Sequence, residues 1–98
     1  MCYYSLMKYY NWHPDKNEIL KSQRGISFEE IVFHIANGDE VDVFDHPNQD
    51  RYPGQKISVI IVDGYAYLVP YVELETEIFL KTIIPSRKAT KKYVGRQT

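Results

Sequence analysis

The sequence predicts a small protein of the α+β class, in which two helices pack on one antiparallel sheet. Two observations lead to this prediction: helix-start signals occupy residues 13–38, and apolar segments with strand character fill residues 39–84. The predicted order is β-α-α-β-β-β-β, followed by a short basic C-terminal helix or tail. A chain of 98 residues can bury one core without a metal or disulfide. We therefore expect residues 1–98 to form a single domain, with an ordered core at about residues 8–93.

The first strand and the first helix are predicted from residues 8–24. Residues 8–12 form a short aromatic run, as strands often do, and we expect Trp12 to anchor the core rather than to stack on a ligand. Pro14 suits the first turn of a helix, where the missing N–H of proline has no consequence. Gly25 supplies a C-terminal stop, so this helix should end at about Arg24.

A second helix is predicted to begin directly afterwards. Ser27 can cap it, and Glu30, three residues further on, completes a capping box. Gly38 is expected to end the helix. One face carries apolar residues at the i, i+3, i+4 and i+7 positions, which is typical of a helix buried on one side. The residues of this face are Phe28, Ile31, Val32 and Ile35.

A half-exposed strand is predicted at residues 39–45, because acidic and apolar residues alternate there. This alternation places Val41 and Val43 toward the core. The following loop, residues 46–55, is dense in turn residues, and long loops in compact domains are often functional. It carries His46, Arg51 and Tyr52.

The remaining strands should continue an antiparallel meander, with the first strand added at one side. Residues 56–62 are almost all β-branched, and Asp63-Gly64 is a strong signal for a two-residue hairpin. Further strands are expected at residues 65–72 and 77–84. The strands are predicted to contribute Val59, Ile61, Leu68, Leu80 and Ile84 to the core.

Composition argues against several classes of site. The sequence has no Gly-rich phosphate loop and no histidine or cysteine spacing of the kind that binds metals. Cys2 is the only cysteine, which fits a reducing compartment. No apolar run approaches the roughly 20 residues of a membrane span, and the N-terminus lacks the apolar block that a secretory signal is expected to have. We therefore expect a cytoplasmic protein that engages no membrane and needs no metal or cofactor.

Charge is distributed unevenly along the chain, although the net charge is only -1. From residue 81 onward there are six cations and no carboxylate. Cations beside hydroxyl groups suit phosphate binding. A solvated, frayed C-terminal tail is an equally good interpretation of the composition alone. The six cations are Lys81, Arg87, Lys88, Lys91, Lys92 and Arg96.

Two stretches of the sequence carry a family resemblance. The first contains Trp12, Lys16 and Asn17, followed by Gly-Ile-Ser-Phe-Glu-Glu at residues 25–30; the second is Ile-Ile-Pro-Ser-Arg-Lys-Ala-Thr-Lys-Lys at residues 83–92. In this order they resemble the BrnT toxins of bacterial type II toxin–antitoxin pairs, a variant of the RelE-type ribonuclease fold. The Arg-Lys-Ala-Thr run is the more specific motif.

The chain departs from that family's pattern in ways that suggest a divergent branch. Arg24 stands where the family commonly has histidine before the glycine, and Pro85-Ser86 replaces Ser-Ala. If that histidine were an obligatory acid or base, Arg24 would weaken the case for nuclease activity.

The resemblance implies a toxin that cleaves RNA by attack of the 2′-hydroxyl, without a metal. It also implies a cognate, DNA-binding antitoxin encoded nearby. RelE-like enzymes are thought to stabilise the phosphorane and move protons with Lys, Arg, Tyr and Glu. The catalytic residues are then expected among Arg87, Lys88, Lys91, Arg24, Arg51 and His46, and the RNA contacts among Lys16, Lys81, Lys92 and Tyr93.

A second class of function remains open at this stage. The chain is alternatively a non-catalytic interaction module, or a degenerate toxin, that binds a protein partner or a nucleic acid. RNA cleavage by the purified protein would separate the two classes.

Overall fold

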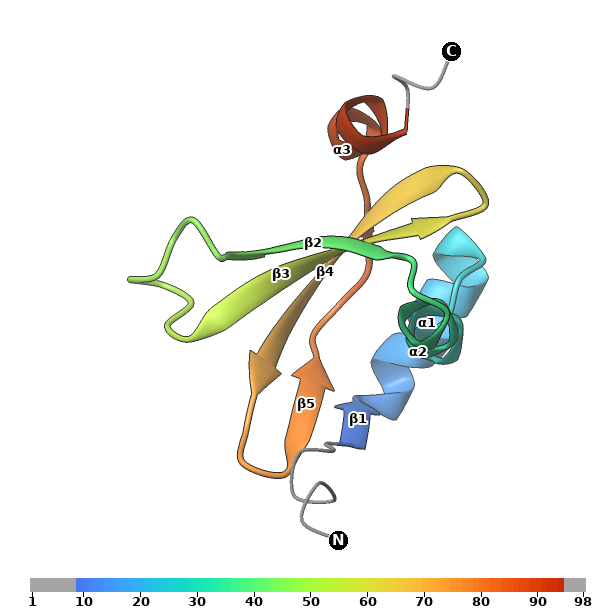
Figure 1. The fold of residues 1–98 in the computed structure, drawn as a ribbon. Coiled ribbons are helices and arrows are strands. Elements are labelled where there is room, and N and C mark those ends of the chain that lie inside the picture. The colour runs from blue at the N-terminus through green and yellow to red at the C-terminus, as the bar shows by residue number, and fades with distance from the viewer. Residues whose placement is uncertain (1–8, 95–98) are drawn as a thin grey trace, which may run out of the picture.

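The computed structural model describes residues 9–94, so Lys8 of the predicted first strand and Arg96 of the basic segment lie outside the described residues. The described chain is a compact α+β fold with three helices and a mixed sheet of six strands (Figure 1). The elements are β1 (Tyr9–Trp12), α1 (Pro14–Arg24), α2 (Phe28–Ala36), β2 (Glu40–Asp45), β3 (Gln55–Val62), β4 (Tyr65–Glu73), β5 (Glu77–Leu80), β6 (Ile84–Pro85) and α3 (Arg87–Tyr93).

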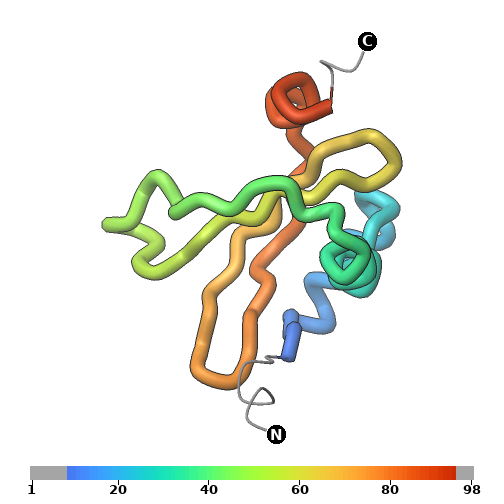
Figure 2. The backbone as a smooth tube through the Cα atoms, viewed as in Figure 1, coloured from blue at the N-terminus to red at the C-terminus, as the bar shows by residue number. Residues whose placement is uncertain are grey.

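The sheet has the strand order β1-β5-β4-β3-β2, with β6 paired to β4 beyond the end of β5. Strands β2 to β5 form the predicted antiparallel meander, and β1 lies at its edge beside β5 (Figure 2). The prediction of a fully antiparallel sheet was wrong, because β1 runs parallel to β5. Tight hairpins force antiparallel neighbours, whereas β1 is connected to the rest of the sheet through α1 and α2 and is free of that constraint.

The predicted last strand, residues 77–84, is interrupted after Leu80. The carbonyl of Pro70 on β4 accepts a 2.8 Å hydrogen bond from the Lys81 amide. Proline has no N–H with which to return a second bond, so the ladder cannot continue there. The chain then turns Ile83 into the core, and Ile84, which was predicted to be buried, is 41% exposed.

The helix boundaries follow the capping signals of the sequence. Gly25 adopts a left-handed conformation with φ 67° and caps α1 after Arg24. The capping box of Ser27 and Glu30 is present in both directions, with bonds of 3.2 and 3.1 Å. Helix α2 ends at Ala36, and Gly38 follows with φ 84°.

One buried residue locks the two N-terminal helices together. Asn17 on α1 is 4% exposed, and its Oδ1 accepts from the Phe28 amide at 2.8 Å. Its Nδ2 donates to Oε1 of Glu29 at 2.9 Å, a bond that holds the pKa of Glu29 below its usual value. The side chain thus satisfies the free amide at the start of α2, which would otherwise lose a hydrogen bond.

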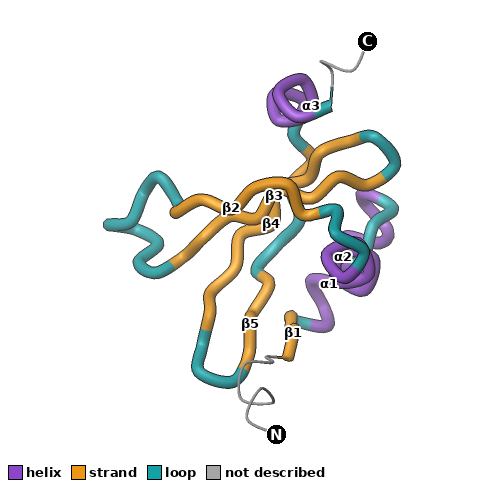
Figure 3. Tube along the Cα trace, in the orientation of Figure 1, coloured by secondary structure: helices purple, strands orange, loops and turns teal. Residues whose placement is uncertain are grey.

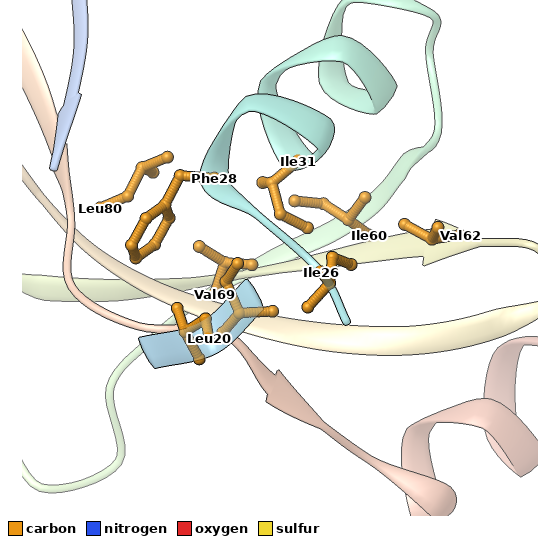
Figure 4. Close-up of a cluster of buried hydrophobic side chains, with 9 residues drawn as sticks. Leu20, Ile26, Phe28, Ile31, Ile60, Val62, Val69 and Leu80 are labelled. Atoms are coloured by element: carbon orange, nitrogen blue, oxygen red, sulfur yellow. The ribbon is translucent and has the colours of Figure 1, made fainter. Parts of the chain in front are cut away.

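The main core lies between these two helices and one face of the sheet (Figure 4). Phe28 and Ile31 are completely buried, and Trp12 stacks on Phe28 with ring centroids 5.6 Å apart. Val32 and Ile35 border the core as half-buried residues. The buried residues of the cluster are Leu20, Ile26, Phe28, Ile31, Ile60, Val62, Val69, Leu80 and Ile83.

The sheet is covered on its second face as well, which corrects the predicted single core. Val59, Ile61 and Leu68 point away from α1 and α2 and pack with Ala66 and Ala89 under α3. A strand buried on both faces is a nearly continuous apolar run, so the sequence of β3 carries no alternation that assigns its faces. Figure 3 shows α3 on one side of the strands and the two N-terminal helices on the other.

Strand β2 is an edge strand in which every residue is exposed. The prediction that Val41 and Val43 are buried was wrong, because they are 47% and 41% exposed. The register shifts between Glu40 and Asp42, so Val41 sits in a bulge. Acidic residues and a bulge are common on edge strands, since both discourage pairing with another chain.

The position of α2 leads to a stability prediction. Ile31→Asp should prevent folding, because an unpaired carboxylate would replace a side chain with no exposed surface. Phe33→Asp is a matched control on the same helix, where the native side chain is 62% exposed. Circular dichroism melting curves of the two variants test this placement, and equal melting temperatures would contradict it.

Candidate functional site

The basic segment that the sequence predicted as a helix or a tail is a short helix fixed to the sheet. Ser86 caps α3, with its Oγ accepting from the Ala89 amide at 3.0 Å. Thr90 Oγ1 accepts from the Ala66 amide of β4 at 2.8 Å and donates to the Ser86 carbonyl at 2.7 Å. The Ser86 amide in turn donates to the Ala66 carbonyl at 3.0 Å.

These bonds change the interpretation of the hydroxyl groups in the segment. Ser86 and Thr90 hold the helix in place, so the two hydroxyls are committed to backbone groups. Each satisfied backbone group avoids the cost of a buried, unpaired polar atom. The interpretation of the segment as a frayed tail does not hold for residues 86–93.

The side chains of α3 are sorted by their i, i+4 spacing. Ala89 and Tyr93 pack on the second face of the sheet. Lys88 and Lys92 stand one residue earlier on the helix and line a groove between α3 and the sheet. Arg87 and Lys91 form a further stripe of exposed cations that does not line it.

The groove has an apolar floor, a cationic rim and a volume of about 170 Å³. Its floor comes from the second face of β2, β3 and β4, and its rim comes from α3. Phe44 on β2 is 40% exposed and lies beside it. The lining residues are Phe44, Val59, Leu68, Ser86, Lys88, Ala89, Lys92 and Tyr93.

A carboxylate–phenol pair joins the groove residue Tyr93 to strand β2. The Tyr93 hydroxyl donates to Oδ2 of Asp42 on β2 at 2.5 Å. This bond, followed by one from the Val43 amide, lowers the pKa of Asp42, and the charge of Lys92 lowers it further. The same bond raises the pKa of Tyr93, so the phenol is a proton donor at neutral pH. Lys92 Nζ lies 5.2 Å from the centroid of the Tyr93 ring.

Sequence reasoning missed the contribution of β2 to this site. Asp42 and Phe44 share one face of the strand, which the alternation of residues 39–45 indicates. The same alternation does not show that this face lies against α3, because the contact joins residues 51 positions apart.

Lys81 lies on the same face of the sheet as the groove. It follows the buried Leu80, and its Nζ is 5.4 Å from the centroid of the Phe79 ring. Phe79 pairs with Val72 of β4, away from the helix-covered core. Lys81 therefore adds a cation to this face of the sheet without lining the groove.

The structure separates His46 and Arg51 from α3. Both lie in the loop between β2 and β3, which projects from the far end of the hairpin (Figure 1). Helix α3 is fixed at Ala66, opposite Ile61 of β3, and the loop joins β3 at Gln55. Six residues of strand correspond to about 20 Å. Within the loop, His46 packs on Tyr52 with centroids 4.4 Å apart.

Arg24 and Lys16 also lie away from the groove. Arg24 Nη1 donates to the carbonyl of Ile83 at 2.6 Å, which ties the end of α1 to the segment between β5 and β6. Lys16 is half-buried on α1, the helix that covers the opposite face. The structure thus brings together Lys88, Lys92 and Tyr93, with Arg87 and Lys91 on the neighbouring stripe of the same helix.

The described residues were also searched for other kinds of site. Within residues 9–94, no group of three or more His, Cys, Asp or Glu side chains is arranged to hold a metal ion. None of the helices in that part of the chain is long and apolar enough to cross a membrane. In comparisons with known proteins, no family model, no curated protein and no solved structure matches this chain.

The contact of Arg24 predicts a role in stability. Arg24→Met should lower the free energy of unfolding by about 1–3 kcal/mol, because the Ile83 carbonyl, on a residue with no exposed surface, loses its donor. Lys21→Met, in the last turn of the same helix, is the control, since the side chain of Lys21 makes a 3.4 Å surface contact with Glu18. Urea denaturation measures both; an Arg24 variant as stable as wild type would show that the bond contributes nothing.

The Asp42–Tyr93 bond predicts that the docking of α3 depends on pH. Because the pKa of Asp42 is lowered, the ionised carboxylate stabilises the folded state. This stabilisation is complete above the ordinary pKa of 3.8 and is lost as pH falls through the lowered pKa. Because the pKa of Tyr93 is raised, the protonated phenol also stabilises the folded state. This stabilisation is complete below the ordinary pKa of 10.0 and is lost as pH rises through the raised pKa. The pKa of Tyr93, measured by NMR titration of its ring, should therefore fall toward the ordinary value of 10.0 in the Asp42→Asn variant. An unchanged pKa would show that the pair is not formed in solution.

Proposed function

We propose that the groove beside α3 binds the phosphodiester backbone of RNA, and that the chain is a metal-independent endoribonuclease, the toxin of a type II toxin–antitoxin pair. The observation that supports the proposal is the joint position of Lys88, Lys92 and Tyr93 at one groove. Two cations at an i, i+4 spacing can contact neighbouring phosphates, while an apolar and aromatic floor suits bases or sugars. The resemblance of residues 83–92 to the BrnT family is the basis for the toxin assignment.

The chemistry expected at this groove is transesterification. The 2′-oxygen attacks the neighbouring phosphorus and loses its proton to a base, the P–O5′ bond breaks, and the 5′-oxygen gains a proton. Lys88 and Lys92 would stabilise the negative charge of the phosphorane. Tyr93 stays protonated and is oriented by Asp42, so it can donate a hydrogen bond to a phosphate oxygen.

Proton abstraction is the weaker part of this arrangement. Asp42 is a carboxylate that feels the charge of Lys92, and its lowered pKa makes it a poor base. The expected catalysis therefore depends on charge stabilisation more than on a strong general base. This predicts a large loss of rate when the groove cations are removed.

A second candidate function is a binding module that does not cleave. The observation in its favour is that the structure scatters four of the ten residues expected at the site: His46 and Arg51 lie at the far loop, and Lys16 and Arg24 lie on α1. Under this alternative, the groove would hold RNA or a protein segment without reaction. Binding and cleavage must therefore be measured separately.

The proposed antitoxin would be recognised at the same place. An apolar floor with a cationic rim favours a partner segment in which apolar and acidic residues occur together. Electrostatic attraction of this kind raises association rates at low salt. Co-purification of the chain with the product of an adjacent gene would support the partnership, and recovery of the free chain alone would count against it.

The proposal makes a quantitative prediction about RNA affinity. Lys88→Ala/Lys92→Ala removes two cations from the groove, and Arg87→Ala/Lys91→Ala removes two from the neighbouring stripe of the same helix. Each phosphate contact to single-stranded RNA contributes about 0.7 to the slope of log affinity against log salt. The groove variant should reduce this slope by about 1.4, measured with 2′-O-methyl RNA that cannot be cleaved. The control variant should change it little, and equal losses would refute the groove as the binding site.

The same variants test catalysis on unmodified RNA. Loss of charge stabilisation should lower the cleavage rate on the order of 10²-fold in the groove variant. Tyr93→Phe should also slow cleavage while leaving the salt slope unchanged, because the phenol carries no charge. RNA binding by wild type with no cleavage would favour the binding module, and loss of neither activity in the groove variant would overturn the site.

A further inference from the structure

A second cavity lies on the face of the sheet opposite to the groove. It has a volume of about 130 Å³ and lies near the end of α2, over β1, β5, β4, β3 and β2. Its wall is about evenly divided between polar and apolar surface. The lining residues are Tyr10, Ile35, Glu40, Val43, Ser58, Val69, Tyr71, Ile78 and Leu80.

Two tyrosines provide the aromatic part of the wall. Burial, reinforced by the charges of Glu40 and Glu73, raises the pKa of Tyr10 and of Tyr71, so both phenols are neutral. Neither hydroxyl has a hydrogen-bond partner among residues 9–94. Neutral aromatic rings present an electron-rich face that attracts cations.

The charged group of the cavity is a carboxylate. Glu40 accepts a short hydrogen bond from the hydroxyl of Ser58, which is 2% exposed, and this bond fixes the carboxylate at the cavity wall. Glu73 and Asp45 add negative charge close to Tyr71. Lys56 is the neighbouring cation, opposite Asp45 and Tyr71 in the sheet register, but it does not line the cavity.

These features discriminate between classes of ligand. An anion would be repelled by the carboxylates. A purely apolar ligand would cover part of the Glu40 carboxylate and offer it no countercharge, because the partner that Glu40 has there, the Ser58 hydroxyl, is neutral. We propose that this cavity binds an organic cation, an alkylammonium or guanidinium group, which contacts the rings of Tyr10 and Tyr71 and pairs with the carboxylate of Glu40.

The cation can belong to a free amine or to a Lys or Arg side chain of another protein, and the chemistry at the cavity is the same. The cavity and the groove lie on opposite faces of the sheet. The proposal therefore does not depend on RNA binding, and Glu40→Gln should leave the salt slope for RNA unchanged.

The test uses three small probes with the same carbon chain: n-butylguanidinium, n-butylammonium and neutral n-butanol. They are titrated into the wild-type chain and followed by the NMR shifts of the Ser58 and Tyr71 amides. The two cations should shift these amides in a saturable way, and n-butanol should bind at least tenfold more weakly. A pentapeptide with one central Arg separates the sources: tighter binding than the free cation assigns the cavity to a partner chain, and equal binding assigns it to a small amine.

Two variants and one control decide the contacts. Glu40→Gln keeps a group that can bond to Ser58 and should weaken cation binding about tenfold. Tyr71→Leu should weaken it about 2- to 30-fold by loss of the ring, with a melting curve to show that the variant is folded. Glu75→Gln removes the same charge from the exposed β4–β5 turn and should have little effect. Absence of binding by both cations, equal binding of n-butanol, or full binding by Glu40→Gln would overturn the proposal.

Discussion

The interruption of the last strand at Pro70 determines how the two faces of the sheet are used. Pro70 accepts a hydrogen bond from the Lys81 amide but cannot donate one, so β5 ends after Leu80. The segment after β5 leaves the strand ladder, and Ile83 packs in the core under α1 and α2. Its carbonyl accepts a hydrogen bond from Arg24. The chain then rejoins β4 as β6 and emerges on the opposite face, where α3 is fixed at Ala66. A continuous strand from residue 77 to 84 would carry the helix to a different place.

The fold consequently has a hollow on each face of one sheet. Strand β3 contributes Ser58 to the cavity on one face and Val59 to the groove on the other, which are neighbours in sequence. Strand β2 likewise offers Glu40 to the cavity and Asp42 to Tyr93. The lining charges differ in sign, since Lys88 and Lys92 line the groove while Glu40 lines the cavity. The groove proposed for RNA and the cavity proposed for an organic cation therefore have no lining residue in common.

The fold was largely predictable because its signals are local. The capping box at Ser27, the left-handed Gly25 and the Asp63-Gly64 hairpin each depend on a few adjacent residues, and each lies where the sequence placed it. The errors concern contacts between distant segments. The direction of β1, the second buried face and the exposure of Val41 depend on packing that local patterns do not record. The same distinction applies to the candidate site. The cations of α3 are close in sequence and therefore predictable as a group, whereas the contact of Asp42 with Tyr93 and the separation of His46 from α3 depend on the arrangement of the sheet.

The position of Arg24 illustrates how a departure from a family pattern can be interpreted physically. The proposed kinship with BrnT toxins places Arg24 where histidine is common, and a missing acid or base would weaken a nuclease assignment. In the structure, however, the side chain of Arg24 donates to the Ile83 carbonyl and lies on the far side of the sheet from the groove. A carbonyl requires only a donor, which either a guanidinium or an imidazole N–H supplies. Under the proposed kinship, the departure at this position therefore concerns a residue that holds the 81–83 segment and does not line the groove.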